Sequence, residues 1–356
     1  MGPLCILHAG TEKTGSTSLQ HFLRLNEAAL AARRIWVPRA LLADPADSAF
    51  NHMALSTASH ISAGWPDDLQ TALGLKDIAG MEAHRAEVAA RLAEERAGLG
   101  FTPEAMIISS EHVHSRLREI EDVERAKALL EPYCGAFKVV LYLRRQDDMA
   151  RSLAALALRG YARAVRVLPD FNTPHGRDEV LHVNQGYFDF AEIIDRLAWV
   201  FGEAAMTVRL YDPDGDGRFD TIDDFFGALG VDINALARPA RQNGGMSQTA
   251  GELLAYVNRV LMGHPRRDLV RARVLAYVQA KLPGALNRAP AGEAALFLRQ
   301  FAFSNETVRR RWFPARETLF PPVAEDVPRP AHVPLTDEAA AQLLADILNH
   351  PVVERM

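Results

Sequence analysis

The sequence predicts an α/β protein in which helices cover both faces of a central parallel sheet. Short apolar runs alternate with longer segments whose apolar residues recur at the helical spacing, a pattern typical of βαβ units. These runs are apolar along their whole length, as in strands that are buried on both faces. From about residue 249 onward the pattern is mostly helical. We therefore expect one domain over 1–356, with a three-layer α/β/α core over about 1–235 and a helical extension over about 236–356.

The predicted strands are short apolar runs that end at polar or small residues: 4–8, 35–38, 105–110, 137–145 and 206–211. The predicted helices carry apolar residues three and four positions apart, over about 16–33, 81–99, 122–133, 146–162, 188–202 and 219–230. Two segments, 40–66 and 164–186, are rich in small, polar, proline or glycine residues and are expected to be irregular.

Composition narrows the class of protein. Of the 356 residues 48% are hydrophobic and 24% are charged, which is ordinary for a soluble globular protein. The net charge of −5 argues against a general nucleic-acid binder. Cys5 and Cys134 show no metal or disulfide spacing, and no signal peptide or membrane-spanning run is visible. We expect a cytoplasmic protein without an integral membrane segment, and the sequence carries no signature of an oligomeric state.

The turn after the first strand, "HAGTEKTGST", has the composition of an anion-binding site. Parallel sheets bind ligands beyond the carboxyl ends of their strands, and here a glycine-containing turn leads directly into a helix N-terminus. Lys13 adds a positive charge, and it is one of only five lysines in the chain. The residues that follow it provide flexible backbone and hydroxyl donors: Thr14, Gly15, Ser16, Thr17 and Ser18. The alternative is an ordinary turn in which Ser and Thr only cap the helix.

The segment "EKTGSTS" (12–18) resembles the 5′-phosphosulfate loop of the sulfotransferase family, P-K-[ST]-G-[ST]-[ST], with Glu12 in place of the proline. It is P-loop-like but not a GxxxxGK[ST] loop, because the lysine precedes the second glycine. The resemblance implies that 3′-phosphoadenosine 5′-phosphosulfate is the co-substrate and that no metal is required. It also implies that residues 13–18 bind the nucleotide.

A second motif fits the same family. Sulfotransferases carry R-x-x-x-D-x-x-x-S in a later strand–turn–helix, and "LYLRRQDDMARSL" places Arg144, Asp148 and Ser152 at this spacing. The resemblance assigns the 3′-phosphate to Arg144 and Ser152, and the guanidinium fork of arginine suits phosphate oxygens. Arg145 lies next to Arg144 and could share this role. The alternative is an amphipathic helix with an acidic first turn.

Sulfuryl transfer to a hydroxyl needs a base for the acceptor proton and positive charge near the leaving phosphate. Lys13 suits the second role. For the base, the resemblance places Glu111 where cytosolic sulfotransferases have a histidine, with His112 as the second choice. His52 is the third choice, because carbohydrate-type enzymes place their base in that region. Alternatively, Glu111 caps the following helix or pairs with an arginine. A metal site at "EHVH" is not expected, because no further ligands cluster nearby in the sequence.

An aspartate-rich loop at 212–223 resembles a calcium loop. Asp212, Asp214, Asp216 and Gly217 match its first positions, but Asp223 stands where the usual ligand is glutamate, and a strand precedes the loop. A simple Asp-Gly turn is therefore favoured over a calcium site.

Three functions remain compatible with the sequence. The first is a sulfotransferase that acts on a hydroxyl of a carbohydrate or other small-molecule acceptor. The second is a P-loop kinase-like phosphotransferase, which would need magnesium ligands, with Glu111 as the acidic residue at a strand end. The third is a nucleotide-binding protein without catalytic activity, although the candidate bases argue against it.

Overall fold

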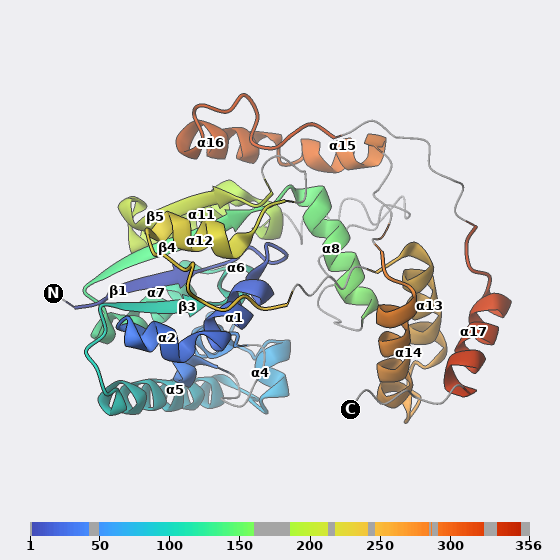
Figure 1. Ribbon diagram of the computed structural model, residues 1–356, viewed down its shortest axis with the longest axis horizontal. Coiled ribbons are helices and arrows are strands. Elements are labelled where there is room, and N and C mark those ends of the chain that lie inside the picture. Colours follow the sequence, from blue (N-terminus) through green and yellow to red (C-terminus); the bar gives the residue numbers. More distant parts are fainter. Residues whose placement is uncertain are drawn as a thin grey trace. The chain divides into compact units, whose positions relative to one another are not determined.

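The computed structural model describes residues 2–42, 50–159, 186–212, 218–240, 246–284, 286, 291–323 and 333–349 (Figure 1). Contacts divide the chain into two compact units. The first comprises Met1–Arg145, Gln185–Arg241 and Gln300–Pro321, and the second comprises Gln146–Asn184, Gln242–Arg299 and Pro322–Met356. The single domain over 1–356 stays a prediction.

The first unit contains a five-stranded sheet in the order β2-β3-β1-β4-β5 (Figure 1). All four strand pairs are parallel, which confirms the predicted central parallel sheet. The strands are β1 Leu4–His8, β2 Ile35–Trp36, β3 Ala105–Ser109, β4 Ala136–Leu143 and β5 Met206–Leu210. The apolar sequence of these strands follows from their position, because helices cover both faces of the sheet.

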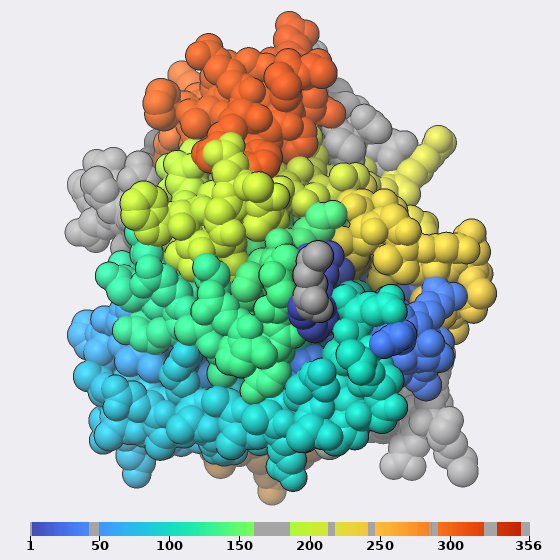
Figure 2. Space-filling model, turned by 90° about the vertical axis from the view of Figure 1, so that its left-hand side faces the viewer, coloured from blue at the N-terminus to red at the C-terminus, as the bar shows by residue number. Residues whose placement is uncertain are grey.

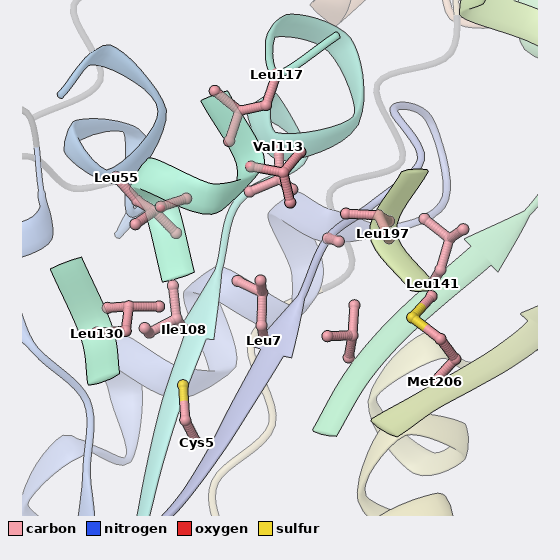
Figure 3. Packing of buried hydrophobic residues seen from close by; sticks show 14 of the residues in the cluster. Cys5, Leu7, Leu55, Ile108, Val113, Leu117, Leu130, Leu141, Leu197 and Met206 are labelled. Carbon is pink, nitrogen blue, oxygen red and sulfur yellow. The ribbon is translucent and has the colours of Figure 1, made fainter. Parts of the chain in front are cut away.

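The two faces of the sheet bury different side chains of the same strands. On one face Ile6 and Val140 pack with residues of α1, α2 and α12. On the other face Leu7 and Leu141 pack with residues of α3, α5, α7, α11 and α16, as Figure 3 shows for part of this layer. This arrangement confirms the predicted three layers. The helices of the first unit are α1 Ser16–Leu25, α2 Glu27–Ala32, α3 Met53–Thr57, α4 Asp68–Ala72, α5 Ile78–Gly98, α6 His112–Arg116, α7 Ile120–Leu130, α11 Phe190–Phe201, α12 Thr221–Leu229 and α16 Ala302–Trp312.

The second unit is helical in its described residues. Its helices are α8 Gln146–Leu158, α13 Gln248–Val260, α14 Arg267–Lys281, α15 Ala291–Arg299 and α17 Asp337–Asn349. A separate apolar core joins α13, α14 and α17 through buried residues such as Leu254, Val274 and Ile347, with Leu158 of α8 packed against it. The predicted helical C-terminal region is thus confirmed, while most of the predicted loop 164–186 lies outside the described residues.

Three local predictions differ from the structure. The helix expected over 16–33 is divided at Asn26, whose side-chain amide donates to the carbonyl groups of Phe22 and Ala237. The second strand ends before Pro38, which has no N–H to donate to a neighbouring strand. The segment expected to be irregular contains α3, which its short, weakly periodic sequence did not reveal. Among the described helices, none is both long enough and apolar enough to cross a membrane.

Candidate active site

The carboxyl end of β1 lies where the connections of the sheet change direction. From β1 the chain runs to the edge strand β2 and returns through β3, and it then crosses to β4 on the other side of β1. Such a switch point is the usual ligand site of an open parallel sheet, because the connections leave a crevice there. β1 pairs directly with both β3 and β4, so the three strand ends that the sequence singles out are neighbours.

The loop between β1 and α1 has the backbone of an anion cradle. Gly15 precedes the helix with φ 85° and ψ 13°, and no side chain caps the first turn of α1. The first N–H groups of a helix have no intrahelical partner and carry the positive end of the dipole. Ser16 is buried, and its hydroxyl oxygen has no hydrogen-bond partner among the described residues. The N–H groups of the first turn of α1 and the Ser16 hydroxyl are therefore available as donors at the same place. Thr17 and Ser18 are exposed.

Buried hydrogen bonds hold this loop in place. The Thr14 hydroxyl donates to the carbonyl oxygen of Thr11 over 2.6 Å, and the Thr221 hydroxyl donates to that of Thr14 over 3.1 Å. A Cβ atom on Gly15 would overlap the Thr221 side chain. The loop is thus fixed by its own hydroxyls and by the start of α12, and Gly15 is needed both for its positive φ and for space.

Gly15→Ala should lower the free energy of unfolding by about 1–3 kcal/mol, because it adds strain at a positive φ and a clash with Thr221. Urea unfolding of Gly15→Ala in the wild-type and Thr221→Ala backgrounds measures both effects. The Thr221→Ala background should recover part of the loss, since it removes the hydroxyl that the new methyl group meets. Equal losses in the two backgrounds would contradict the proposed clash.

Lys13 and Arg144 meet at this loop. Lys13 is half-buried with φ 66°, and its carbonyl oxygen accepts a hydrogen bond from Arg144 Nη1 over 2.7 Å. The Arg144 guanidinium also lies 5.0 Å from the ring centre of Tyr211, which follows β5. The predicted 3′-phosphate ligand Arg144 is therefore attached to the predicted 5′ loop. Ser152 belongs to the second unit, where its hydroxyl donates to the Asp148 carbonyl oxygen over 2.9 Å.

Glu111 lies beside the same loop. Its Cα is close enough to Gly10 that a Cβ atom there would stand only 3.0 Å away. Its carboxylate accepts hydrogen bonds from Gln20 Nε2 at 2.8 Å and from Asn51 Nδ2 at 3.1 Å. It occupies the N-cap position of α6, but its side chain makes no capping hydrogen bond, and in the described ranges it makes no ion pair with an arginine. Its carboxylate is held between two amides, and among the described residues neither a capping hydrogen bond nor an arginine pair accounts for its position.

His52 lies in the protein interior instead. It is fully buried, and its Nδ1 accepts from the Ser109 backbone N–H over 3.0 Å. Burial lowers the pKa of His52 to about 4, so its ring is neutral at neutral pH. His8 at the end of β1 is similar: its Nδ1 lies 2.8 Å from Ser109 Oγ, and burial lowers its pKa to about 3. These contacts fix the end of β3, two residues before Glu111.

A second acidic side chain, Glu12, lies near His112 on α6. Burial alone would raise the pKa of Glu12, but the charges of His112 and His114 and the polar side chains around the carboxylate outweigh this effect, and the pKa is lowered. His114 Nε2 donates to the Tyr187 carbonyl oxygen over 2.9 Å, and burial lowers the pKa of His114 to about 4. Glu12, which stands where the resembled motif has proline, therefore interacts electrostatically with α6.

Only part of the aspartate-rich loop at 212–223 lies within the described residues. Residues 213–217, which include Asp214 and Asp216, lie outside the described residues. Asp220 caps α12 by accepting from the backbone N–H groups of Ile222 and Asp223. The carboxylate of Asp223, the twelfth position, pairs with Arg238. Among the described residues, no group of three or more His, Cys, Asp or Glu side chains is arranged to hold a metal ion.

Sequence analysis misses Gln20 and Asn51, the two partners of Glu111. No motif marks either residue. Gln20 stands one helical turn after Ser16, so the two share a face of α1, and this spacing is the one signal that could have indicated Gln20. Asn51 directly precedes His52, but nothing in the sequence shows that its amide reaches the end of β3.

Comparison with known proteins gives limited similarity. No family model matches the chain. Over 181 residues, or 49% of this chain, it is 29% identical to an uncharacterized protein of Archaeoglobus fulgidus, and the match spans 46% of that relative's length. Among solved structures it is similar to a sulfotransferase from Alicyclobacillus acidocaldarius, with a TM-score of 0.38 and 16% identity over 76% of this chain and 95% of that one. It is also similar to a sulfotransferase domain from the curacin biosynthetic pathway, with a TM-score of 0.33 and 11% identity over 65% of this chain and 74% of that one.

Proposed function

We propose that this protein is a sulfotransferase that transfers a sulfuryl group from 3′-phosphoadenosine 5′-phosphosulfate to an acceptor hydroxyl of a carbohydrate. The observation that carries the proposal is the contact between two motifs far apart in the sequence. Arg144 donates to the carbonyl oxygen of Lys13 within the loop that leads into α1. One nucleotide with phosphates at both its 5′ and 3′ positions would use both motifs.

The proposed roles follow from charge and geometry. The first turn of α1, with the Ser16 hydroxyl, offers donors to the 5′-phosphosulfate. The acceptor oxygen attacks sulfur, the bond from sulfur to the phosphate oxygen breaks, and Lys13 stabilises the negative charge that develops on that phosphate. Glu111 takes the proton of the acceptor hydroxyl. Its carboxylate lies beside Gly10 and keeps its orientation through Gln20 and Asn51.

The kinase-like alternative is less compatible with the loop. A phosphotransferase of that class uses the hydroxyl after its loop lysine as a magnesium ligand. Here that residue is Thr14, which is buried and donates its hydroxyl proton to the Thr11 carbonyl oxygen. Retention of the candidate base Glu111 beside the loop also favours an enzyme over a binding protein without activity.

Arg144→Ala should weaken binding of 3′-phosphoadenosine 5′-phosphate by about 10- to 100-fold, the scale of one charge-assisted hydrogen-bond pair. Binding of AMP, which lacks the 3′-phosphate, should change much less. Isothermal titration of both nucleotides against the variant and the wild type measures the difference. A parallel and equal loss for both nucleotides would contradict the assignment of Arg144 to the 3′-phosphate.

Arg145→Ala is the matched control for this experiment. Arg145 Nη1 donates to the Pro321 carbonyl oxygen over 3.1 Å, so its side chain is directed to another segment of the first unit. We expect nucleotide affinities within about twofold of the wild type, as for a substitution away from the site. If Arg145→Ala reproduces the loss and Arg144→Ala does not, the 3′-phosphate belongs to Arg145.

A further inference from the structure

A pocket of about 650 Å³ lies on the outer side of α11, within the first unit. Residues at the start of α7 and at the start of α16 complete its lining. In Figure 2 the orange residues of α16 lie directly on the yellow-green residues of α11. The volume is in the usual range for pockets that bind small ligands.

Two large aromatic side chains at this pocket are exposed to solvent. Trp199 of α11 is 74% exposed, and Phe303 of α16 is 87% exposed. Exposed aromatic rings forfeit the stabilisation that burial would give them, and two at the border of one pocket indicate a binding surface. Both rings present apolar faces against which a ligand ring could stack.

The polar lining is already held in place. Glu192 Oε1 accepts from Arg196 Nη1 over 3.2 Å, and Asp195 Oδ1 lies 2.6 Å from Arg311 Nη1. Asp189 Oδ1 accepts from the Ser304 hydroxyl over 2.6 Å. Each carboxylate keeps acceptor capacity beyond these bonds, so the pocket offers oriented acceptors along one side of α11 without further side-chain ordering.

Arginines add donors to the same lining. Arg196 is buried, and its Nε has no hydrogen-bond partner among the described residues. The Arg118 guanidinium lies 5.8 Å from the ring centre of Tyr187. Because Glu119, Asp189, Glu192 and Asp195 outnumber the two arginines of the lining, the pocket has no excess of positive charge. It therefore does not suit an anionic ligand.

We infer that this pocket binds a neutral oligosaccharide and serves as an acceptor subsite, an inference that rests on the proposed sulfotransferase function. A sugar ring presents an apolar C–H face to an aromatic side chain and hydroxyl groups to carboxylates and guanidinium groups. The lining provides all three kinds of partner. Tyr187 lies between the pocket and the cradle, because its ring centre is 5.8 Å from the Arg118 guanidinium and 4.6 Å from the ring centre of His114, whose charge acts on Glu12 of the loop.

Ligand-observed NMR titration without nucleotide tests this inference, using cellotetraose, chitotetraose and maltotetraose with a heparosan tetrasaccharide as the acidic comparison. At least one neutral sugar should bind saturably at millimolar concentration and more tightly than the acidic one. Trp199→Ala and Phe303→Ala should each weaken that binding by about 2- to 10-fold, the scale of one aromatic contact. Trp65→Ala is the matched control: Trp65 is 71% exposed, does not line the pocket, and its removal should leave affinity unchanged.

Three results would overturn the inference. They are the absence of saturable binding to every neutral sugar, tighter binding of the acidic sugar, and an equal loss in the Trp65→Ala variant. Self-association that Trp199→Ala abolishes, without any sugar response, would assign the surface to a second copy of the chain. Binding of 3′-phosphoadenosine 5′-phosphate, measured on the same samples, separates this failure from a failure of the proposed function.

Discussion

Lys13→Ala should lower kcat by about 10²–10³-fold, comparable with the loss of one oxyanion-hole donor, and should affect nucleotide affinity much less. The reason is the position of the Lys13 side chain, which carries the positive charge. Lys13 lies in the loop between β1 and the first turn of α1, where the bridging phosphate oxygen of a bound nucleotide would gain negative charge as the bond to sulfur breaks. Its charge therefore matters more in the transition state than in the ground state.

Release of 3′-phosphoadenosine 5′-phosphate at saturating co-substrate, followed by ion-pair chromatography, measures this effect. Lys13→Arg is the matched control, because it keeps the positive charge at the same backbone position and should retain more activity than Lys13→Ala. Arginine places its charge on a wider, planar group, so full activity is not expected. Normal turnover of Lys13→Ala at saturating nucleotide would show that Lys13 only contributes to binding.

Glu111→Gln should keep nucleotide affinity and lose at least about 10²-fold in turnover, as expected when a general base is removed. The glutamine keeps the shape of the side chain and can still accept from Asn51 or Gln20 through its remaining oxygen. It cannot take the proton of the acceptor hydroxyl. The same chromatographic assay, with an acceptor present, measures the loss.

The comparison with the two histidine candidates decides the assignment. His112→Ala should reduce turnover less than Glu111→Gln, since His112 interacts with Glu12 on the loop and its contribution is indirect. For His52 the informative variant is His52→Asn, because an asparagine oxygen can replace Nδ1 as the acceptor for the Ser109 N–H. If Glu111→Gln stays active while His52→Asn folds normally and is inactive, the base lies in the segment after β2.

Much of the fold could be predicted from the sequence because it depends on local patterns. Apolar runs such as 105–110 and 137–145 appear as β3 and β4, within two residues at each end. The shared location of the strand ends also follows from a general rule, because the carboxyl ends of parallel strands lie at the same edge of the sheet, where ligands bind. What the sequence could not show is the division of a helix at Asn26, which depends on a carbonyl group 211 residues away.

The candidate site follows the same distinction. The proximity of Arg144 to the loop at residues 13–18 could be predicted, since the backbone and charge requirements of an anion cradle leave short local motifs at neighbouring strand ends. The support of Glu111 by Gln20 and Asn51 could not be predicted, because both contacts join distant segments. The interior position of His52 is also invisible in the sequence, where a polar residue in a small-residue segment is expected at the surface.

A nucleotide-binding comparison tests the central claim most directly. Purified protein is titrated with 3′-phosphoadenosine 5′-phosphate, AMP and ATP, with and without magnesium, and melting temperatures and affinities are recorded. The 3′-phosphorylated nucleotide should bind more tightly than AMP by about 2–4 kcal/mol, and magnesium should not be required. Equal affinities for 3′-phosphoadenosine 5′-phosphate and AMP, or a preference for ATP that depends on magnesium, would contradict a sulfotransferase.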